Sequence, residues 1–316
     1  MNMQSNHFMG VDVGGTHLKI GLVSREGEIL SFDKEDTKGY RDDPRGFNAR
    51  FVEVMGKYLA KYPDVTKVGI GLPGLISKDR TTTLEIPAIP ELNGFNLKKN
   101  LSEQYPSISF YLENDASAAA LGELKFGKSN PSQDFLFITM GTGIGSALVD
   151  DGQIFKGARG NGLEMGHMLS RGNARLETLI GRNGILNIME RMIHAYPEKA
   201  GELVDKELGT HLLVDTAQAG NPVSLMVFEE VGDILGEAIV YAIRILDVNE
   251  VYFGGGISAG LEFMMPSLEK TIRQYLTNYY LNGLKLKKAS LENNAGTLGA
   301  AALCFMDEKG VKMDLE

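Results

Sequence analysis

The stretch GVDVGGTHLKIGLVSREGEIL (residues 10–30) holds two apolar runs joined by a glycine turn, and a third run after a second turn. Apolar runs bounded by Gly and polar residues predict a meander of three strands. The same order returns in FLFITMGTGIGSALVDDGQIF (residues 135–155), where GQIF stands in the place of GEIL. Two halves that open alike indicate a duplicated α/β domain.

The remaining segments complete each half with helices and further strands. Residues 44–62 have apolar residues at helical spacing, and residues 176–247 are mostly helical by the same criterion. No low-complexity linker separates the halves, so we expect two lobes packed around a cleft. Further strands are expected in KVGIGLPG (residues 67–74), ending in Gly and Pro, at 108–112, and in NEVYFGGGIS (residues 249–258), running into glycines. Further helices are expected at 97–104 and from about 297 onward.

Composition excludes several classes of protein. Hydrophobic residues make up 43% and charged residues 23% of 316, which is typical of globular chains. A net charge of −9 argues against nucleic acid as a partner. No apolar run approaches the ~18 residues of a membrane helix, and we expect no signal peptide. The single cysteine, Cys304, excludes disulfide frameworks within the chain, so a cytoplasmic location is expected.

The stretch FYLENDASAAALGE (residues 110–123) places polar residues between an apolar strand and an alanine-rich helix. Asp115 is either the N-cap of that helix or a carboxylate held at the strand end for chemistry. Both interpretations stay open from this stretch alone.

Glycine clusters offer candidate phosphate-binding turns. In DVGGTHLK (residues 12–19) backbone N–H groups and Thr16 suit a phosphate, and Asp12 suits Mg²⁺ through water, but a plain β-hairpin explains the turn equally well. MGTGIGSAL (140–148) lacks the helix that a dinucleotide fingerprint requires, so only a phosphate-binding hairpin remains. FGGGIS (253–258) would let an adenine or ribose approach the backbone, although a loose connection is the simpler explanation.

One motif is a false match. GELKFGKS (residues 122–129) fits the phosphate-loop pattern letter by letter, but it follows a helix and precedes a strand, the reverse of the required order. We interpret it as a helix C-terminus with Gly127 as the C′ residue.

Taken together, the motifs resemble the ROK family of sugar kinases and sugar-responsive repressors, nearly end to end and in order. They are D-x-G-G-T-x-x-K at 12–19, G-L-P-G at 71–74, E-N-D-A-x-A-A-A-x-G-E at 113–123, G-T-G-I-G at 141–145, E-x-G-H at 164–167, F-G-G-G-I at 253–257 and N-A-G-x-x-G-A-A at 294–301.

The resemblance implies an actin-like ATPase (ribonuclease H-like) fold of two α/β lobes, 1–115 and 116–296, with the C-terminal helix at about 297–316 completing the first. It implies ATP-dependent phosphorylation of a hexose hydroxyl, most simply O6 of glucose or an N-acetylhexosamine, with Asp115 as general base. Sugar would be bound by Gly74, Asn114, Glu164, His167 and Glu177. ATP and Mg²⁺ would be bound by Asp12, Gly14, Gly15, Thr16, Lys19, Gly141, Thr142, Gly143, Gly254, Gly255 and Gly256, with the metal on Asp12.

The sequence departs from the family in two loops. Zinc-containing members carry C-x-C-G-x-x-G-C-x-E after E-x-G-H, whereas GHMLSRGNARLE (residues 166–177) has no cysteine, so we expect no zinc. Where many members place Asn in a sugar loop this chain has Ala88, so either one sugar contact is lost or Asn93 replaces it.

Three functions remain to be weighed. A kinase is the leading hypothesis, and a catalytically silent sugar sensor is the alternative. A repressor would need a helix-turn-helix ahead of Asp12, where only eleven residues stand. The expected partners are a small sugar, ATP and a second copy of the chain, with no membrane.

Overall fold

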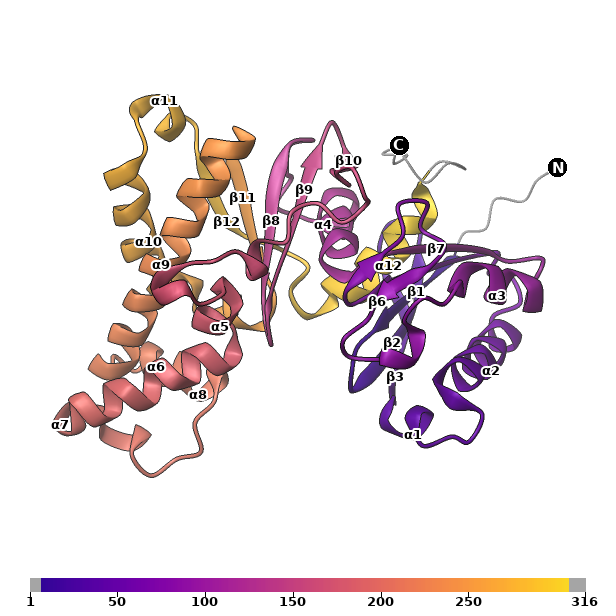
Figure 1. The fold of residues 1–316 in the computed structure, drawn as a ribbon, viewed down its shortest axis with the longest axis horizontal. Helices are drawn as coiled ribbons and strands as arrows, with labels where there is room; N and C mark the ends of the chain where they lie inside the picture. Colours follow the sequence, from indigo (N-terminus) through magenta and orange to yellow (C-terminus); the bar gives the residue numbers. More distant parts are fainter. Residues whose placement is uncertain (1–6, 307–316) are drawn as a thin grey trace. The chain divides into compact units, whose positions relative to one another are not determined.

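The computed structural model describes residues 7–306, and within them lie two five-stranded sheets of the same strand order (Figure 1). The first runs β3-β2-β1-β4-β7 and the second β10-β9-β8-β11-β12. In each, a three-strand meander is extended by two parallel strands, so the duplication expected from the two glycine turns is confirmed. The strands of the first sheet are β1 (His7–Val13), β2 (His17–Ser24), β3 (Ile29–Asp36), β4 (Lys67–Leu72) and β7 (Ser109–Asn114). Those of the second are β8 (Phe135–Met140), β9 (Ile144–Asp150), β10 (Gln153–Ile154), β11 (Glu250–Gly254) and β12 (Lys285–Lys288).

The described chain divides into two compact units. Of the described residues, unit 1 holds 7–134, 147–163 and 293–306, and unit 2 holds 135–146 and 164–292. The division differs from the expected lobes because the alanine-rich helix α4 (Asp115–Phe126) and residues 147–163 belong to unit 1, not to the second half. Helix α12 (Ala295–Ala302) also belongs to unit 1, and the part of the expected C-terminal helix beyond residue 306 lies outside the described residues.

Glycines on the first sheet allow α12 to lie directly on its backbone. Gly10 pairs with Gly21 and with Gly69 on the neighbouring strands, which makes a flat row without side chains. A Cβ atom on Gly10 would lie 2.2 Å from the carbonyl oxygen of Thr297. The adjacent positions Met9 and Val11 belong to the apolar core on the other face, because side chains alternate along a strand. Phe51 of helix α2 (Gly46–Lys61) belongs to the same core.

Small residues also explain the alanine run of α4. A Cβ atom on Gly299 of α12 would lie 2.4 Å from the carbonyl oxygen of Ala118 in α4. Only small side chains permit this backbone separation, and Ala118 and Ala120 are fully buried. The run therefore serves the close packing of α4 with α12, which holds the start of α4 at the end of β7.

Unit 2 is mostly helical outside strands β8, β11 and β12. Residues 176–246 form α5 to α9, as the helical spacing predicts, and α10 packs along α9. Within residues 7–306 none of the helices is both long and apolar enough for a membrane span. The unit 2 helices are α5 (Leu176–Ile180), α6 (Arg182–Ala195), α7 (Pro197–Ala200), α8 (Thr210–Gln218), α9 (Pro222–Leu246), α10 (Leu261–Tyr275) and α11 (Asn278–Leu281). The other elements of unit 1 are α1 (Lys38–Arg41), α2 (Gly46–Lys61), α3 (Leu97–Gln104), β5 (Leu75–Ile76) and β6 (Thr83–Glu85).

Candidate active site

In unit 1, predicted site residues meet at the carboxyl ends of the parallel strands. Asp12 of β1 is level with Gly71 of β4, and Gly71 is level with Glu113 of β7. Asn114 and Asp115 follow Glu113 directly. This edge of a parallel sheet is where α/β folds place their ligands.

Asn114, not Asp115, caps helix α4. Its side-chain oxygen accepts hydrogen bonds from the N–H groups of Ala116 (3.0 Å) and Ser117 (3.2 Å), and its amide nitrogen donates to the carbonyl oxygen of Gly74 (3.2 Å). Gly74 is in the left-handed region with φ of +90°, and a Cβ atom there would lie 2.2 Å from the carbonyl oxygen of Glu85. Asn114 therefore fastens the Gly74 turn to the start of α4.

Asp115 is the first residue of α4 and is only partly buried. One of its carboxylate oxygens accepts a hydrogen bond from the N–H of Ala116 at 2.8 Å. The N-terminus of a helix favours a negative charge. The N-cap role considered for Asp115 thus falls to its neighbour, and the carboxylate of Asp115 stands at the sheet edge described above.

The Gly14–Thr16 turn is a β-hairpin turn in this structure. The N–H of Gly14 donates to the carbonyl oxygen of His17 at 2.8 Å, and Lys19 forms an ion pair of 3.0 Å with Asp12. A Cβ atom on Gly15 would lie 3.0 Å from the Cβ of Ala88. The loop containing Ala88 therefore packs directly on the turn.

Asn93 has a structural contact that bears on the sugar loop. Its side-chain oxygen accepts a hydrogen bond from the N–H of Ile86 at 2.7 Å. The residue closes the loop around Ala88, and its oxygen is engaged there. This contact gives Asn93 a structural role in the loop.

In unit 2, Glu164, His167 and Glu177 form a second group. His167 Nε2 lies 3.3 Å from Glu177 Oε1, and both side chains keep some exposure. Although Glu164 is exposed as a whole residue, partial desolvation raises the pKa of its carboxyl; His167 opposes this shift and Glu177 adds to it. Carboxylates and an imidazole set this close suit the hydroxyl groups of a sugar.

The backbone around Glu164 and His167 is fixed by β9. The N–H of Met165 donates to Ser146 Oγ at 3.1 Å, and a Cβ atom on Gly166 would lie 2.1 Å from the carbonyl oxygen of Ile144. Gly166 is thus required for close approach to the strand, and this approach sets the direction of the two side chains beside it.

The glycine clusters at 141–143 and 254–256 differ in how much space surrounds their backbone. Gly141 faces open space, as does Gly256, whereas a Cβ on Gly254 would meet the ring of Phe137 at 2.7 Å. Gly255 has φ of +81° and lies against the backbone of Met140. Packing therefore accounts for two of the three glycines in 254–256, and open backbone remains at Gly141 and Gly256.

The Gly141–Gly143 turn lies beside the second group. A Cβ atom on Gly143 would lie 2.8 Å from Glu177 Oε2. The N–H of Arg182 donates to the carbonyl oxygen of Gly141 at 3.0 Å. Glu177 thus lies between the predicted phosphate turn and His167, with one carboxylate oxygen toward each.

Some of the described residues carry groups that suit a nucleotide or Mg²⁺. Open glycine backbone such as that at Gly141 suits a phosphate, and a carboxylate such as that of Asp12 suits Mg²⁺. Among the residues from 7 to 306, no three His, Cys, Asp or Glu side chains come together in a way that could hold a metal ion. Asp12 would therefore serve Mg²⁺ as a single carboxylate, with water and phosphate as the other ligands.

Two features of the structure differ from, or add to, what the sequence predicts. Helix α4 ends at Phe126 as predicted, but the backbone of Gly127 is extended, with φ of −69°. Glycine is needed at position 127 because a Cβ atom there would lie 2.3 Å from the carbonyl oxygen of Glu123. The buried pair of Arg80 and Glu113 was not predicted. The one available signal was an acid at the end of an apolar strand, and nothing in the local sequence marked its partner 33 residues earlier.

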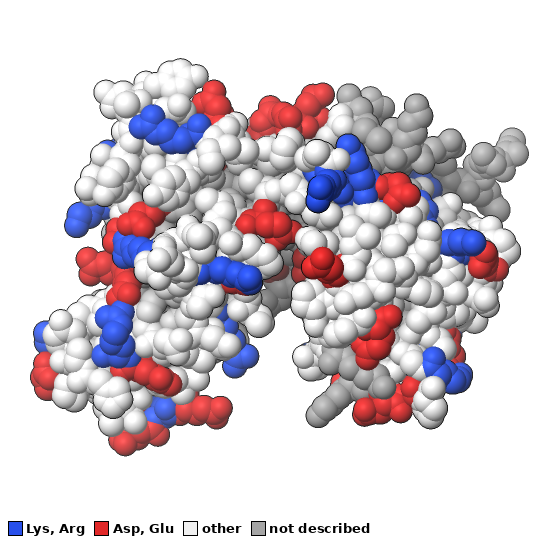
Figure 2. Space-filling model, viewed as in Figure 1, with Lys and Arg blue, Asp and Glu red and all other residues white. Residues whose placement is uncertain are grey.

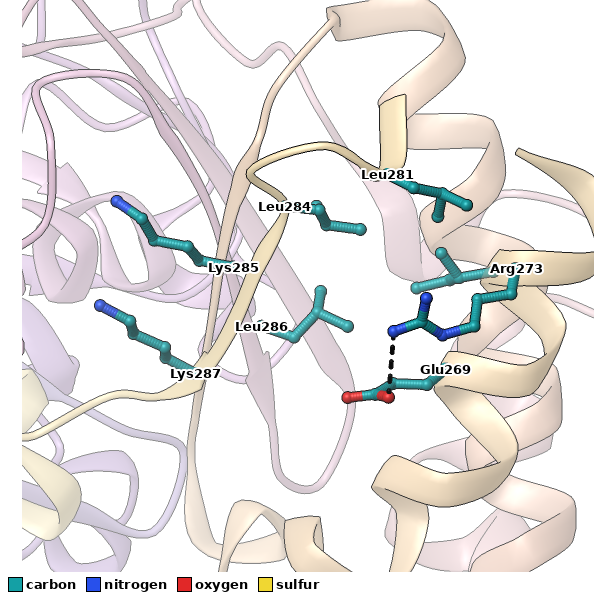
Figure 3. Close-up of a pocket in the computed structure, with 8 residues that line it drawn as sticks. Glu269, Arg273, Leu281, Leu284, Lys285, Leu286 and Lys287 are labelled. Carbon is teal, nitrogen blue, oxygen red and sulfur yellow. Dashed lines mark ion pairs between the residues drawn. The ribbon is translucent and has the colours of Figure 1, made fainter. Parts of the chain in front are cut away.

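A hollow outside these groups lies in unit 2. It has a volume of about 320 Å³ and is lined by α10, the Leu281–Leu284 segment and β12. Figure 3 shows Leu284 and Leu286 pointing toward α10, whereas Lys285 and Lys287 point to the opposite side. None of the predicted site residues lines it.

On the face shown in Figure 2, lysine and arginine are interspersed with aspartate and glutamate. On this face the described residues form no continuous basic surface.

Comparisons with known proteins agree with these motifs. The ROK family model matches residues 8–306. A glucokinase from Thermotoga maritima is 31% identical over 312 residues, covering 93% of this chain and 96% of that protein. A Cytophaga hutchinsonii structure, provisionally named a sugar kinase, is 38% identical with a TM-score of 0.90 and covers 94% of this chain and 99% of that one.

A third similar protein was solved with ligands. It is a ROK family glucokinase from Streptomyces griseus in complex with glucose and AMPPNP, 26% identical with a TM-score of 0.78, over 94% of this chain and 99% of that one. The chain therefore belongs to the ROK family and has the actin-like ATPase fold of its sugar kinases.

Proposed function

We propose that this ROK family member transfers the γ-phosphoryl group of ATP to a hexose hydroxyl, O6 of glucose or of an N-acetylhexosamine. The observation that carries the proposal is the placement of Asp115, whose carboxylate stands at the first residue of α4 and at the carboxyl end of β7. A carboxylate there would accept the proton of the attacking hydroxyl. The glucose and AMPPNP bound to the similar Streptomyces griseus enzyme support this assignment.

The residues that we assign to the sugar each offer a polar group to a hydroxyl. They are Asn114, the backbone at Gly74, Glu164, His167 and Glu177. Carboxylates accept hydrogen bonds from hydroxyls, and imidazole donates or accepts. Phosphoryl transfer depends mostly on positioning, so these contacts would fix the reacting hydroxyl beside Asp115.

ATP would be held by the glycine turns. Among the residues that we assign to ATP, the backbone at 14–16 and at 141–143 is suited to phosphates, and Gly256 leaves room for a nucleoside. Mg²⁺, when bound with ATP, neutralises phosphate charge. Asp12, held by Lys19, is the residue we assign to it.

A coupled ADP-release assay with Mg-ATP tests the proposal. The sugars are glucose, N-acetylglucosamine, N-acetylmannosamine, fructose, mannose and allose. We expect turnover on at least one, reduced about 10²–10⁴-fold by Asp115→Asn, as for loss of a general base. Lys128→Ala, in the false phosphate-loop match, is the control and is expected to keep full activity.

Two outcomes would overturn the proposal, the first for the activity and the second for the site. Sugar binding detected by thermal shift, with no ADP released from any sugar, would make the chain a sugar sensor. Loss of turnover in Lys128→Ala with activity kept in Asp115→Asn would instead place the chemistry at residues 122–129.

A further inference from the structure

A short segment joins two of the proposed sugar-binding residues. Residues 168–176 run from His167 to Glu177 as a tight hairpin. The N–H of Ser170 donates to the carbonyl oxygen of Ala174 at 2.8 Å, and the N–H of Leu176 donates to that of Met168 at 2.9 Å. We call residues 168–176 the connecting hairpin. Any movement of it moves His167 and Glu177 together, because one precedes it and the other follows it.

The tip of the connecting hairpin is exposed and has few apolar anchors. Leu169 is 71% exposed. Gly172 and Asn173, in the 3-10 turn η3 (Arg171–Asn173), are both left-handed, with φ of 63° and 60°. A segment of this kind opens readily unless side chains tie it down.

Arg171 at that tip is tied to helix α9. Its Nε lies 3.0 Å from Glu237 Oε2 and its Nη2 lies 2.6 Å from Glu237 Oε1, so the contact is bidentate. Nη2 also lies 2.7 Å from Asp233 Oδ2. Asp233 is in turn bonded by the hydroxyl of Thr271 from α10, which joins a third segment to the contact.

We propose that Arg171 is a positioning residue for sugar binding, and that its contacts with Asp233 and Glu237 hold the connecting hairpin so that His167 and Glu177 face the sugar. The proposal rests on the proposed sugar-kinase function. It assigns Arg171 no contact with the sugar itself. The sugar class it concerns is the hexose already proposed.

The geometry makes this contact stronger than most surface ion pairs. A single exposed pair contributes little, because side-chain entropy and solvent screening offset it. A planar guanidinium with two carboxylates forms several charge-assisted bonds at once. The hydrogen bonds to Glu237 raise the pKa of Arg171. The pKa of Asp233 is lowered, because the hydrogen bonds from Thr271 and Arg171 outweigh the burial that would raise it.

The same helix provides a matched control. Arg191 of α6 places Nη2 2.6 Å and 2.5 Å from the two oxygens of Glu230, two turns before Glu237 on α9. Arg191→Ala therefore removes a multi-contact Arg–Glu pair from α9 without touching the connecting hairpin. Comparison with Arg171→Ala separates the effect on the site from a general loss of an ion pair.

The experiment measures kinetics and hydrogen exchange on the full chain. For Arg171→Ala we expect the sugar KM to rise about tenfold, with kcat and the ATP KM within about twofold, since only sugar positioning is disturbed. The amides of Ser170 and Leu176 should exchange at least about tenfold faster without ligand. Arg171→Lys should fall between, because lysine lacks the planar fork.

Exchanging the charges of Arg171 and Glu237 should restore part of the sugar affinity. The double variant Arg171→Glu/Glu237→Arg should recover part of the sugar KM that Arg171→Glu alone loses. Arg191→Ala should match the wild type in KM and in exchange of the connecting hairpin.

The outcomes are distinct. If Arg171→Ala behaves as Arg191→Ala does in both readouts, the proposal is wrong. It is also wrong if Arg171→Ala lowers kcat and changes both KM values together with a large drop in Tm, because that pattern is a global structural effect. If the wild type phosphorylates no sugar, the proposed function falls while hydrogen exchange and sugar binding still decide the role of Arg171.

Discussion

Arg80 Nε donates a hydrogen bond of 2.9 Å to a carboxylate oxygen of Glu113, and the two side chains are only 10% and 2% exposed. The other oxygen of Glu113 accepts from the N–H of Asn114 at 2.9 Å, and Arg80 Nη1 donates to the carbonyl oxygen of Gly160 at 2.8 Å. This buried pair therefore supports the residue that caps α4, and behind it the proposed base Asp115.

Removing one partner of this pair should strongly destabilise unit 1. Arg80→Met leaves the charge of Glu113 buried and uncompensated, which typically costs about 3–5 kcal/mol. The matched control is Lys99→Met, which breaks the exposed Lys99–Glu103 pair of 3.8 Å and should cost about 0.5 kcal/mol or less.

Urea unfolding followed by far-UV circular dichroism gives both values. The double variant Arg80→Met/Glu113→Gln should be more stable than Arg80→Met alone, because no buried charge remains. An Arg80→Met chain within about 1 kcal/mol of the wild type would contradict the role given to this pair.

Gly69→Ala tests the contact between α12 and the first sheet. A Cβ atom on Gly69 would lie 1.8 Å from the carbonyl oxygen of Ala300, and this neighbour is backbone that cannot rotate away. Helix α12 must shift, so we expect a loss of about 1–3 kcal/mol or more. Gly39→Ala is the control, since a Cβ there meets nothing within 4 Å and lies in helix α1, where alanine is preferred.

The comparison is made by thermal unfolding of both variants. A Gly69→Ala protein as stable as the wild type would mean that α12 does not lie on the glycine row.

Local sequence patterns were enough to predict much of the fold. The turn after Val13 and its repeat after Met140 correctly predicted both meanders and the duplication, because strand alternation and turn glycines are local properties. The beginning and end of α4 were also predicted closely. The motif order gave the family, and the family gave the candidate site residues.

What was missed depends on partners distant in sequence. The need for Gly10 and Gly69 arises from α12, more than 200 residues later, so the strand sequence alone could not reveal it. The same is true of Arg80 with Glu113 and of Arg171 with α9. The choice of Asn114 over Asp115 as the cap depends on side-chain direction at the end of β7, which the sequence leaves open.

Cys304, the single thiol, should be unreactive in the native chain. Burial raises the pKa of its thiol to about 12, against an ordinary value of 9.0, with Lys67 opposing the shift. The nucleophilic thiolate is then scarce at pH 8. We expect a disulfide reagent to label the native protein only as fast as unit 1 opens, and to label the denatured protein at once.

The raised pKa of Cys304 also predicts how the stability of the folded chain changes with pH. A group with a raised pKa in the folded state contributes stability below its unfolded value, and loses that contribution as pH rises through the folded value. Stability should therefore fall between about pH 9 and 12 in part through Cys304, and Cys304→Ala should reduce that fall. Labelling of the native chain at the rate of free cysteine would contradict this placement.

The raised pKa of Glu164 predicts that the sugar KM rises at acid pH, which gives the pH profile an acid limb. Desolvation keeps the proton on Glu164 at pH values above the ordinary 4.5, His167 limits this effect and Glu177 strengthens it. Only the ionised carboxylate accepts hydrogen bonds with both oxygens, so the sugar KM should rise as pH falls toward that raised value. For stability the sign is opposite: the contribution of Glu164 is present below 4.5 and is lost as pH rises through the raised value.

Glu164→Gln separates the two effects. The variant should have a higher sugar KM at neutral pH, and its KM should no longer rise in acid through this group. Glu229→Gln, at an exposed carboxylate on α9, should keep the limb of the wild type. Sugar KM measured from pH 4.5 to 8 at saturating ATP gives the profile, and an acid limb that persists unchanged in Glu164→Gln would assign it to another group.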